Sequence, residues 1–145
     1  MNNEESLREK LRQAIIGSYN AISLSLNSDK KIQKEKENFE FINIDKIDSH
    51  KDFKIARAES DTEALKKRFS NNLILNKNQP RNMKSKELYN ISERLRYELI
   101  GSNKYTGIKK NLIFRYQEEI LNKKNQAINS KEDCPVTLAF ELYML

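Results

Sequence analysis

The sequence predicts a mainly α-helical single domain, a bundle of about five helices with a small β-hairpin around residues 38–55. Apolar residues recur at intervals of three and four over most of the chain, which is the spacing of one helix face. The length of 145 residues is common for one domain. Hydrophobic residues make up 37% of the chain and charged residues 33%, so the sequence can fill a modest core. We therefore expect one helical domain over residues 1–145.

The N-terminal part predicts one long helix followed by a strand-like stretch. The helix is expected over residues 4–26. Its apolar stripe comprises Leu7, Leu11, Ala14, Ile15, Ile22 and Leu26. Residues 27–37 are polar and lysine-rich, which indicates a loop. Aromatic and β-branched residues then recur between Phe39 and Phe53, and they predict a hairpin because a lone strand would leave its backbone groups unpaired.

The centre of the chain predicts two helices separated by a loop. The first helix spans residues 54–71. Its inward stripe comprises Ala58, Asp61, Leu65 and Phe69. Residues 71–84 are rich in asparagine and contain Pro80, so we expect a loop. The residues expected to attach this loop to the core are Leu73, Ile74 and Leu75. The second helix is expected to begin after Ser85 as its N-cap and to end at Gly101. Its inward stripe comprises Leu88, Ile91, Leu95 and Leu99.

Two further helices are predicted in the C-terminal part. One begins at Tyr105 or Thr106, and the short connection before it favours antiparallel packing on the preceding helix. Its inward residues are Ile108, Leu112, Tyr116 and Ile120. The last helix begins at Asp133 or Cys134 with Pro135 in the first helical position, and it stays apolar up to Leu145. Because such an apolar end normally packs on another surface, we expect the chain to be a fragment or a truncated form of a longer protein.

Composition favours a cytoplasmic protein. No apolar run approaches the length of a membrane span, and the first residues lack the apolar stretch of a signal peptide. The one cysteine, Cys134, cannot form an internal disulfide. A net charge of +6 is compatible with a basic helical nucleic-acid-binding protein. Basic residues alternate with acidic ones along most of the chain, however, and such mixed faces are normally solvated.

Signatures of catalysis are missing from the sequence. It has no phosphate-binding glycine loop, no zinc-protease motif and no paired cysteines. Four potential metal ligands lie close together in the chain, but their spacing matches no established site. They are Asp45, Asp48, His50 and Asp52. The Cys134 thiol would need a neighbouring base, and the only histidine is distant in sequence. We therefore predict no catalytic, cofactor-binding or metal-binding residue in this chain.

The segment from Glu93 to Leu112 is the most distinctive part of the sequence. Glu93 can pair with Arg96 at a spacing of three, and Arg94 with Glu98 at a spacing of four. Alternatively, a buried polar cluster between two helices would set their register. Its members would be Arg57, Asp61, Glu93 and Arg96. An ordinary solvated face is the other interpretation, and the residues alone do not decide between them.

This segment resembles the N-terminal region of the T subunit of aerobic cobaltochelatase, the CobT family. That family has the pattern E-x-x-R-x-E-x-x-G followed by G-x-x-x-N-L. The matching residues here are Glu93, Arg96, Glu98, Gly101, Gly107, Asn111 and Leu112. A second stretch is similar to the family's R-G-x-A-D-x-x-A-L helix through Arg57, Asp61, Ala64 and Leu65, with departures at Ala58 and Ser60. The opening helix is also similar to the first helix of the family.

The resemblance implies a non-catalytic adaptor or structural domain of the ATP-dependent complex that inserts cobalt into the corrin ring during aerobic cobalamin biosynthesis. The implied partners are the AAA+ ATPase subunit and the large subunit of cobaltochelatase, with no cofactor in this chain. The family's acidic linker and C-terminal von Willebrand A-type domain, with its D-x-S-x-S metal site, are absent from the sequence. A degenerate remnant without chelatase function is therefore a further alternative. The motif residues are expected to serve structure or partner contact.

Overall fold

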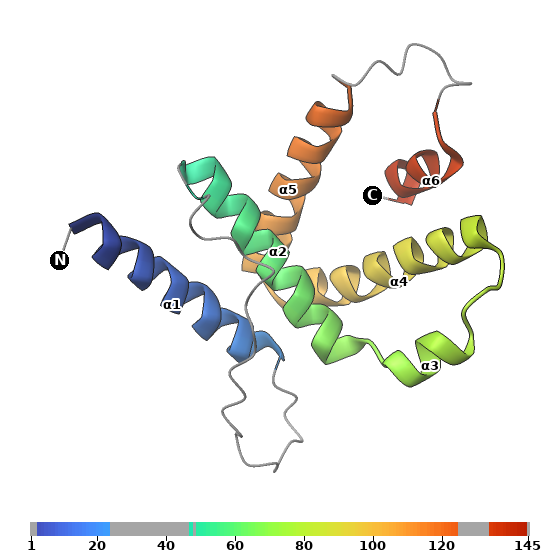
Figure 1. The fold of residues 1–145 in the computed structure, drawn as a ribbon, viewed down its shortest axis with the longest axis horizontal. Coiled ribbons are helices and arrows are strands. Elements are labelled where there is room, and N and C mark those ends of the chain that lie inside the picture. The colour runs from blue at the N-terminus through green and yellow to red at the C-terminus, as the bar shows by residue number, and fades with distance from the viewer. Residues whose placement is uncertain (1–2, 24–46, 48, 125–133, 145) are drawn as a thin grey trace.

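The computed structural model describes residues 3–23, 47, 49–124 and 134–144. Six α-helices occur within these ranges (Figure 1). They are α1 (Asn3–Ser23), α2 (His50–Phe69), α3 (Asn72–Lys77), α4 (Met83–Lys104), α5 (Thr106–Lys124) and α6 (Val136–Met144). The mainly α-helical fold class is confirmed, and no strand occurs in the described ranges. No helix in these ranges has both the length and the apolar character that crossing a bilayer requires.

Side-chain caps fix where the central helices begin. Ser49 and Asp52 form a capping box at the start of α2, each accepting a hydrogen bond from the other's backbone N–H. Asn71 caps α3 and Asn82 caps α4, each through its side-chain oxygen. The expected cap of α4, Ser85, is therefore wrong by one turn. Ser85 instead donates its backbone N–H to the Asn82 side chain at 3.3 Å.

Helix α2 lies at the centre of the molecule. It packs against α1, α4 and α5, whereas α6 packs only against α4 among the closely contacting pairs (Figure 1). The main core forms where α2, α4 and α5 meet the end of α1, and its buried residues are Tyr19, Ile22, Ala64, Leu65, Tyr97, Ile108, Leu112 and Tyr116. Arg68 of α2 donates a hydrogen bond of 2.8 Å to the carbonyl of Ile22, near the end of α1. The main core therefore unites α1, α2, α4 and α5.

The predicted hairpin is not supported where it can be compared with the structure. Residues 38–46 and 48 lie outside the described ranges, and Ile47 has no regular secondary structure. Residues 50–55 form the first turns of α2, because the capping box begins a helix there. Phe53 packs from this helix onto a small second core that contains Ile15 and Ala56. The sequence pattern around Phe53 thus reflects a helix contact.

The loop predicted over residues 71–84 contains a short helix, α3. It does not attach to the core as expected, because the Leu73 side chain is 83% exposed and Ile74 is also exposed. Only Leu75 of the three is partly buried. The two asparagine caps explain the local structure, since asparagine satisfies the free N–H groups at a helix start. An asparagine-rich stretch was thus compatible with a helix bounded by caps.

The inward face of helix α4 was predicted in part: Leu88, Ile91 and Leu95 are partly buried, and Leu95 packs on the main core. Leu99 is 64% exposed, whereas Tyr97, Glu98 and Gly101 are buried. The helix also continues past Gly101 to Lys104 and ends at Tyr105, so Gly101 does not stop it. From Tyr105 the chain enters α5, which runs back in the opposite sense while diverging from α4 (Figure 1). The predicted inward residues Ile108, Leu112 and Tyr116 are buried as expected.

The two terminal helices are more exposed than their sequences suggested. Leu7 of the predicted first stripe is exposed, and residues 24–26 lie outside the described ranges. Helix α6 begins one residue after Pro135, whose carbonyl accepts the first helical hydrogen bond from Ala139 at 2.9 Å. The side chains of Val136 and Tyr143 are largely exposed, the latter 86%. Most of the apolar surface of α6 is thus not covered by described residues.

Candidate functional site

Arg57, Asp61 and Asn111, three of the motif residues, meet between α2 and α5. Asp61 is fully buried, and its Oδ2 atom accepts a 2.7 Å hydrogen bond from the Asn111 amide. Arg57 Nε lies 3.2 Å from Asp61 Oδ1 one turn away, although this ion pair lacks hydrogen-bond geometry. Burial raises the pKa of Asp61, while the Asn111 hydrogen bond and the Arg57 charge oppose that rise. Asn111 therefore supports a carboxylate that water does not reach.

Glu98, another motif residue, is the centre of a second buried polar network (the Glu98 network: Thr62, Glu98, Arg115 and Tyr116). Glu98 is only 3% exposed, and its carboxylate accepts hydrogen bonds from Thr62 Oγ1 at 2.7 Å and Arg115 Nη2 at 3.0 Å. The Tyr116 hydroxyl donates to its other oxygen. Arg115 Nη1 also donates to Thr62 Oγ1 at 2.6 Å. Because these residues come from α2, α4 and α5, the network joins three helices.

The pKa values of two members of the Glu98 network, Tyr116 and Arg115, are shifted. The pKa of Tyr116 is raised by burial first and by the neighbouring Glu98 charge second. Arg115 is 6% exposed, and although burial lowers its pKa, the carboxylates of Glu98 and Glu119 raise it overall. The Arg115 guanidinium is therefore a permanent charge that depends on Glu98 for compensation.

Glu93 and Arg96, the remaining charged motif residues, lie at the surface between α2 and α4. Arg96 Nε donates to Glu93 at 2.7 Å, as predicted from their spacing. Arg96 also donates to the Phe69 carbonyl at 2.6 Å, and Ser70 donates to Glu93 at 2.6 Å. The Arg96 and Ser70 hydrogen bonds lower the pKa of Glu93. These contacts fasten the end of α2 to α4.

The four-residue cluster considered from the sequence therefore does not form. Arg57 and Asp61 pair within α2 and are joined to α5, whereas Glu93 and Arg96 pair within α4. The predicted pairing of Arg94 with Glu98 is also wrong. Arg94 instead donates to Glu141 of α6, and Glu98 accepts its hydrogen bond from Arg115 of α5. This ion pair is a direct polar contact between α4 and α6.

The two motif glycines differ in the space around them for a side chain. A Cβ atom added at Gly101 would lie 2.4 Å from Leu65 Cδ2, well inside van der Waals contact. Gly101 therefore permits α4 to approach the fully buried Leu65 of α2. A Cβ atom at Gly107 would meet nothing within 4 Å. Leu112, the last motif residue, is part of the main core.

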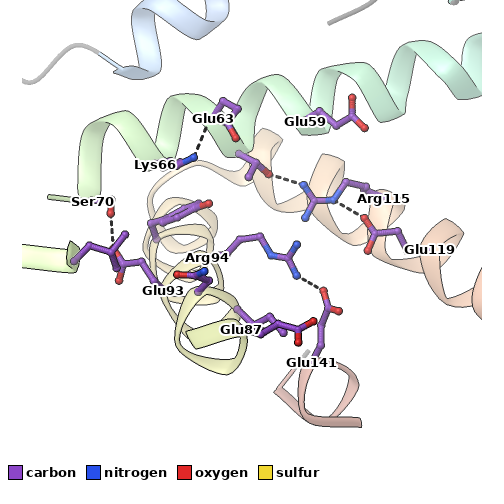
Figure 2. A pocket seen from close by; sticks show the side chains of 15 residues that line it. Glu59, Glu63, Lys66, Ser70, Glu87, Glu93, Arg94, Arg115, Glu119 and Glu141 are labelled. Atoms are coloured by element: carbon purple, nitrogen blue, oxygen red, sulfur yellow. Dashed lines mark hydrogen bonds and ion pairs between the residues drawn. The ribbon is translucent and has the colours of Figure 1, made fainter. Parts of the chain in front are cut away.

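A pocket of about 880 Å³ opens beside the Glu98 network, between α2, α4, α5 and α6 (Figure 2). Arg94 and Arg115 project into this region, as the figure shows. Acidic side chains dominate its charged lining: Glu59, Glu63, Glu87, Glu93, Glu119 and Glu141. The basic lining residues are Lys66, Arg94 and Arg115. We call this the glutamate pocket.

The residues considered from the sequence as possible metal ligands or nucleophile form no such site among the described residues. Asp52 caps α2 through Ser49, and His50 is the first residue of that helix. Asp45 and Asp48 lie outside the described ranges. Within the described part of the chain, no group of three or more acidic, histidine or cysteine side chains is arranged to hold a metal ion. Cys134 is a partly exposed free thiol before α6.

Sequence reasoning missed Thr62 and Arg115. A charged residue such as Arg115 is normally assigned to a solvated face. Its position, three residues after Leu112 and seven after Ile108, places it on the inward stripe of α5 and was a usable signal. Thr62 had no comparable signal, because it lies beside Asp61 in a stretch of polar residues.

Comparison with known protein families gives one match. The family model for the cobalamin biosynthesis protein CobT matches residues 5–144, nearly the whole chain. No curated protein and no solved structure matches the chain. The matched range includes both buried networks and the glutamate pocket.

Proposed function

This chain belongs to the CobT family of cobalamin biosynthesis proteins, and from that premise we propose that it is a non-catalytic adaptor domain of an ATP-dependent cobaltochelatase. In this role it contacts the AAA+ ATPase subunit and the large subunit of the complex. The metal would be inserted into the corrin ring by the large subunit. This chain contributes a rigid helical surface for assembly.

The main support for this proposal is that the polar groups of the buried motif residues join neighbouring helices. The Asp61 carboxylate is held by Asn111, and the Glu98 carboxylate accepts hydrogen bonds from α2 and α5. Both side chains are buried, so neither is placed to meet a substrate. Groups of this kind fix the relative positions of helices at some cost in stability. Such rigidity suits a domain whose task is to present a surface.

Co-purification tests this proposal directly. The tagged chain would be co-expressed with the ATPase subunit and the large subunit from the same organism, and the complexes would be separated by size-exclusion chromatography. We expect the chain to co-elute with at least one of them. A basic helical protein of similar size serves as the control for charge-driven association. A folded chain that elutes alone would contradict the adaptor proposal.

Nucleic-acid binding stays an alternative prediction, based on the net charge. The same purified chain can be used to distinguish it from the adaptor function. A gel-shift titration at near-physiological salt screens weak electrostatic binding. A shift at micromolar protein, together with no co-elution, would favour that alternative over the adaptor.

A further inference from the structure

The glutamate pocket carries a charge opposite to that of the whole chain. Among the described residues, its lining has six glutamates against three basic residues, whereas the chain has a net charge of +6. Four of the glutamates have a basic partner: Glu63 with Lys66, Glu93 with Arg96, Glu119 with Arg115, and Glu141 with Arg94. Glu59 and Glu87 have no ion-pair partner among the described residues. The pocket is therefore a negative concavity on a positive molecule.

The spread of these carboxylates argues against a single bound cation. No three acidic side chains of the described part converge closely enough to hold a metal ion. The carboxylates come instead from four helices around an opening of about 880 Å³ (Figure 2). Burial raises the pKa of Glu59, and although Arg115 opposes this, Glu119 raises it further. An extended ligand with several positive groups would complement this arrangement better than one ion.

The rest of the pocket wall suits a polypeptide. Leu75, Ile91 and Tyr97 add an apolar portion to the lining. Arg94 Nε and Arg115 Nε are buried and make no hydrogen bond, although Arg115 Nε lies 3.3 Å from Glu119. Arg115 is more than nine-tenths buried and faces the pocket. Both guanidinium groups are already paired with carboxylates, Arg94 with Glu141 and Arg115 with Glu98 and Glu119, so they do not compete for Glu59 and Glu87.

We infer that the glutamate pocket docks a segment of a partner protein that carries several Lys or Arg side chains. Its positive side chains pair with the pocket glutamates, and Glu59 and Glu87 are the two carboxylates available without breaking an existing pair. The inference rests on the proposed adaptor function and adds to it the surface and the chemistry of the partner.

An NMR titration with hexa-arginine tests the pocket, with hexaglutamate as the probe of reversed charge. Three forms of the full chain would be compared at about 0.15 M salt, where charges more than about 8 Å apart are largely screened. The forms are the unaltered protein, E59Q/E87Q in the pocket, and E9Q/E118Q as a matched control. The control removes the same charge from α1 and α5 at glutamates that do not line the pocket. Circular dichroism would verify that all three are folded.

We expect amide shifts on the pocket faces of α2, α4, α5 and α6, and binding about fivefold weaker in E59Q/E87Q, since each exposed ion pair contributes up to about 1 kcal/mol. E9Q/E118Q should bind within about twofold of the unaltered protein because its charges lie outside the site. Equal weakening in both variants, or shifts away from the pocket, would overturn the inference.

Co-purification with the ATPase and large subunits separates the two proposals. If the unaltered chain co-elutes and E59Q/E87Q does so equally well, the adaptor function stands and the pocket is not the docking site. If the unaltered chain does not co-elute, the adaptor proposal fails, and the hexa-arginine titration still decides whether the pocket binds basic segments.

Discussion

The corner where α2, α4 and α5 meet differs sharply from the periphery formed by α3 and α6. In the corner, Glu98 and Arg115 are both buried and each depends on the other for charge compensation. At the periphery, Arg94 and Glu141 form the same kind of pair, but Arg94 is about one-third exposed. Burial of both partners makes the first pair costly to break, whereas in the second pair Glu141 is buried and solvent screens the charges only from the Arg94 side. The motif residues Asp61, Glu98, Gly101, Asn111 and Leu112 lie in or beside the corner, so the family pattern marks the part of the molecule where substitutions should matter most for folding.

The largest expected effect comes from removing one charge of the buried pair. Arg115→Met leaves the Glu98 carboxylate buried with only hydroxyl donors, which should lower the free energy of unfolding by about 3–5 kcal/mol. Urea denaturation followed by circular dichroism measures it. Lys51→Met is the control, because Lys51 is 52% exposed in its pair with Glu118 and should cost at most about 1 kcal/mol. Similar costs for the two variants would remove the contrast between the corner and the surface.

The second effect concerns the hydrogen bond between Asn111 and Asp61. Asn111→Ala leaves a buried acceptor without that donor, so the free energy of unfolding should fall by about 1–3 kcal/mol at neutral pH. The chain would be unfolded in urea at several pH values. In an Asp61→Asn background, the cost of Asn111→Ala in free energy of unfolding should no longer vary with pH.

The direction of that pH dependence follows from the raised pKa of Asp61. A carboxyl group with a raised folded-state pKa contributes stability below its unfolded pKa of about 3.9, and this stability is lost as pH rises through the folded pKa. Asn111→Ala removes a hydrogen bond that lowers the folded pKa, so its cost should be smallest at acid pH and grow as pH rises. A cost that is constant with pH would contradict the assigned role of Asn111.

A third test uses the two motif glycines as a matched pair. Gly101→Ala forces Leu65 to move, which costs about 1–3 kcal/mol, while alanine's helix preference returns up to about 1 kcal/mol. We expect a net destabilisation of about 1 kcal/mol in urea denaturation. Gly107→Ala should be neutral or stabilising, because its Cβ atom would meet open space. The same sign for both substitutions would show that the close approach at Gly101 is not limiting.

The smallest global effect is expected at the periphery. Glu141→Gln weakens the contact between α4 and α6 and should cost below about 1 kcal/mol, because the pair is partly solvated. Its consequence is local: amide hydrogen exchange should accelerate in residues 136–144 and not in α2. Acceleration throughout the chain would indicate that α6 is part of the main cooperative unit.

The helices and much of the core were predictable from sequence, because apolar spacing and capping residues report on local structure. Ile108, Leu112 and Tyr116 face inward as their spacing indicated. Leu99 and Leu73 were misassigned because spacing alone does not say which of two adjacent apolar faces a neighbouring helix covers. Helix α3 was missed because its asparagine-rich sequence also fits a loop.

The candidate site was predicted less completely, because its contacts join distant segments. Asp61 and Asn111 were both identified by the family pattern, yet nothing local indicated that they bond to each other across 50 residues. The glutamate pocket had no sequence signal, since its acidic residues come from four helices and lie far apart in the chain. Pairwise chemistry could be predicted only within one helix, as for Glu93 and Arg96.

The arginine contacts at helix ends have a consequence for how the domain folds. The end of α1 is capped by Arg68 from α2, and the end of α2 is capped by Arg96 from α4. Carbonyl groups in the last turn of a helix have no partner within it, so a cation that arrives there stabilises the end. Each helix thus reaches its final length only when the next one has docked, and the last turns of α1 and α2 should fray together in any fragment that lacks α4.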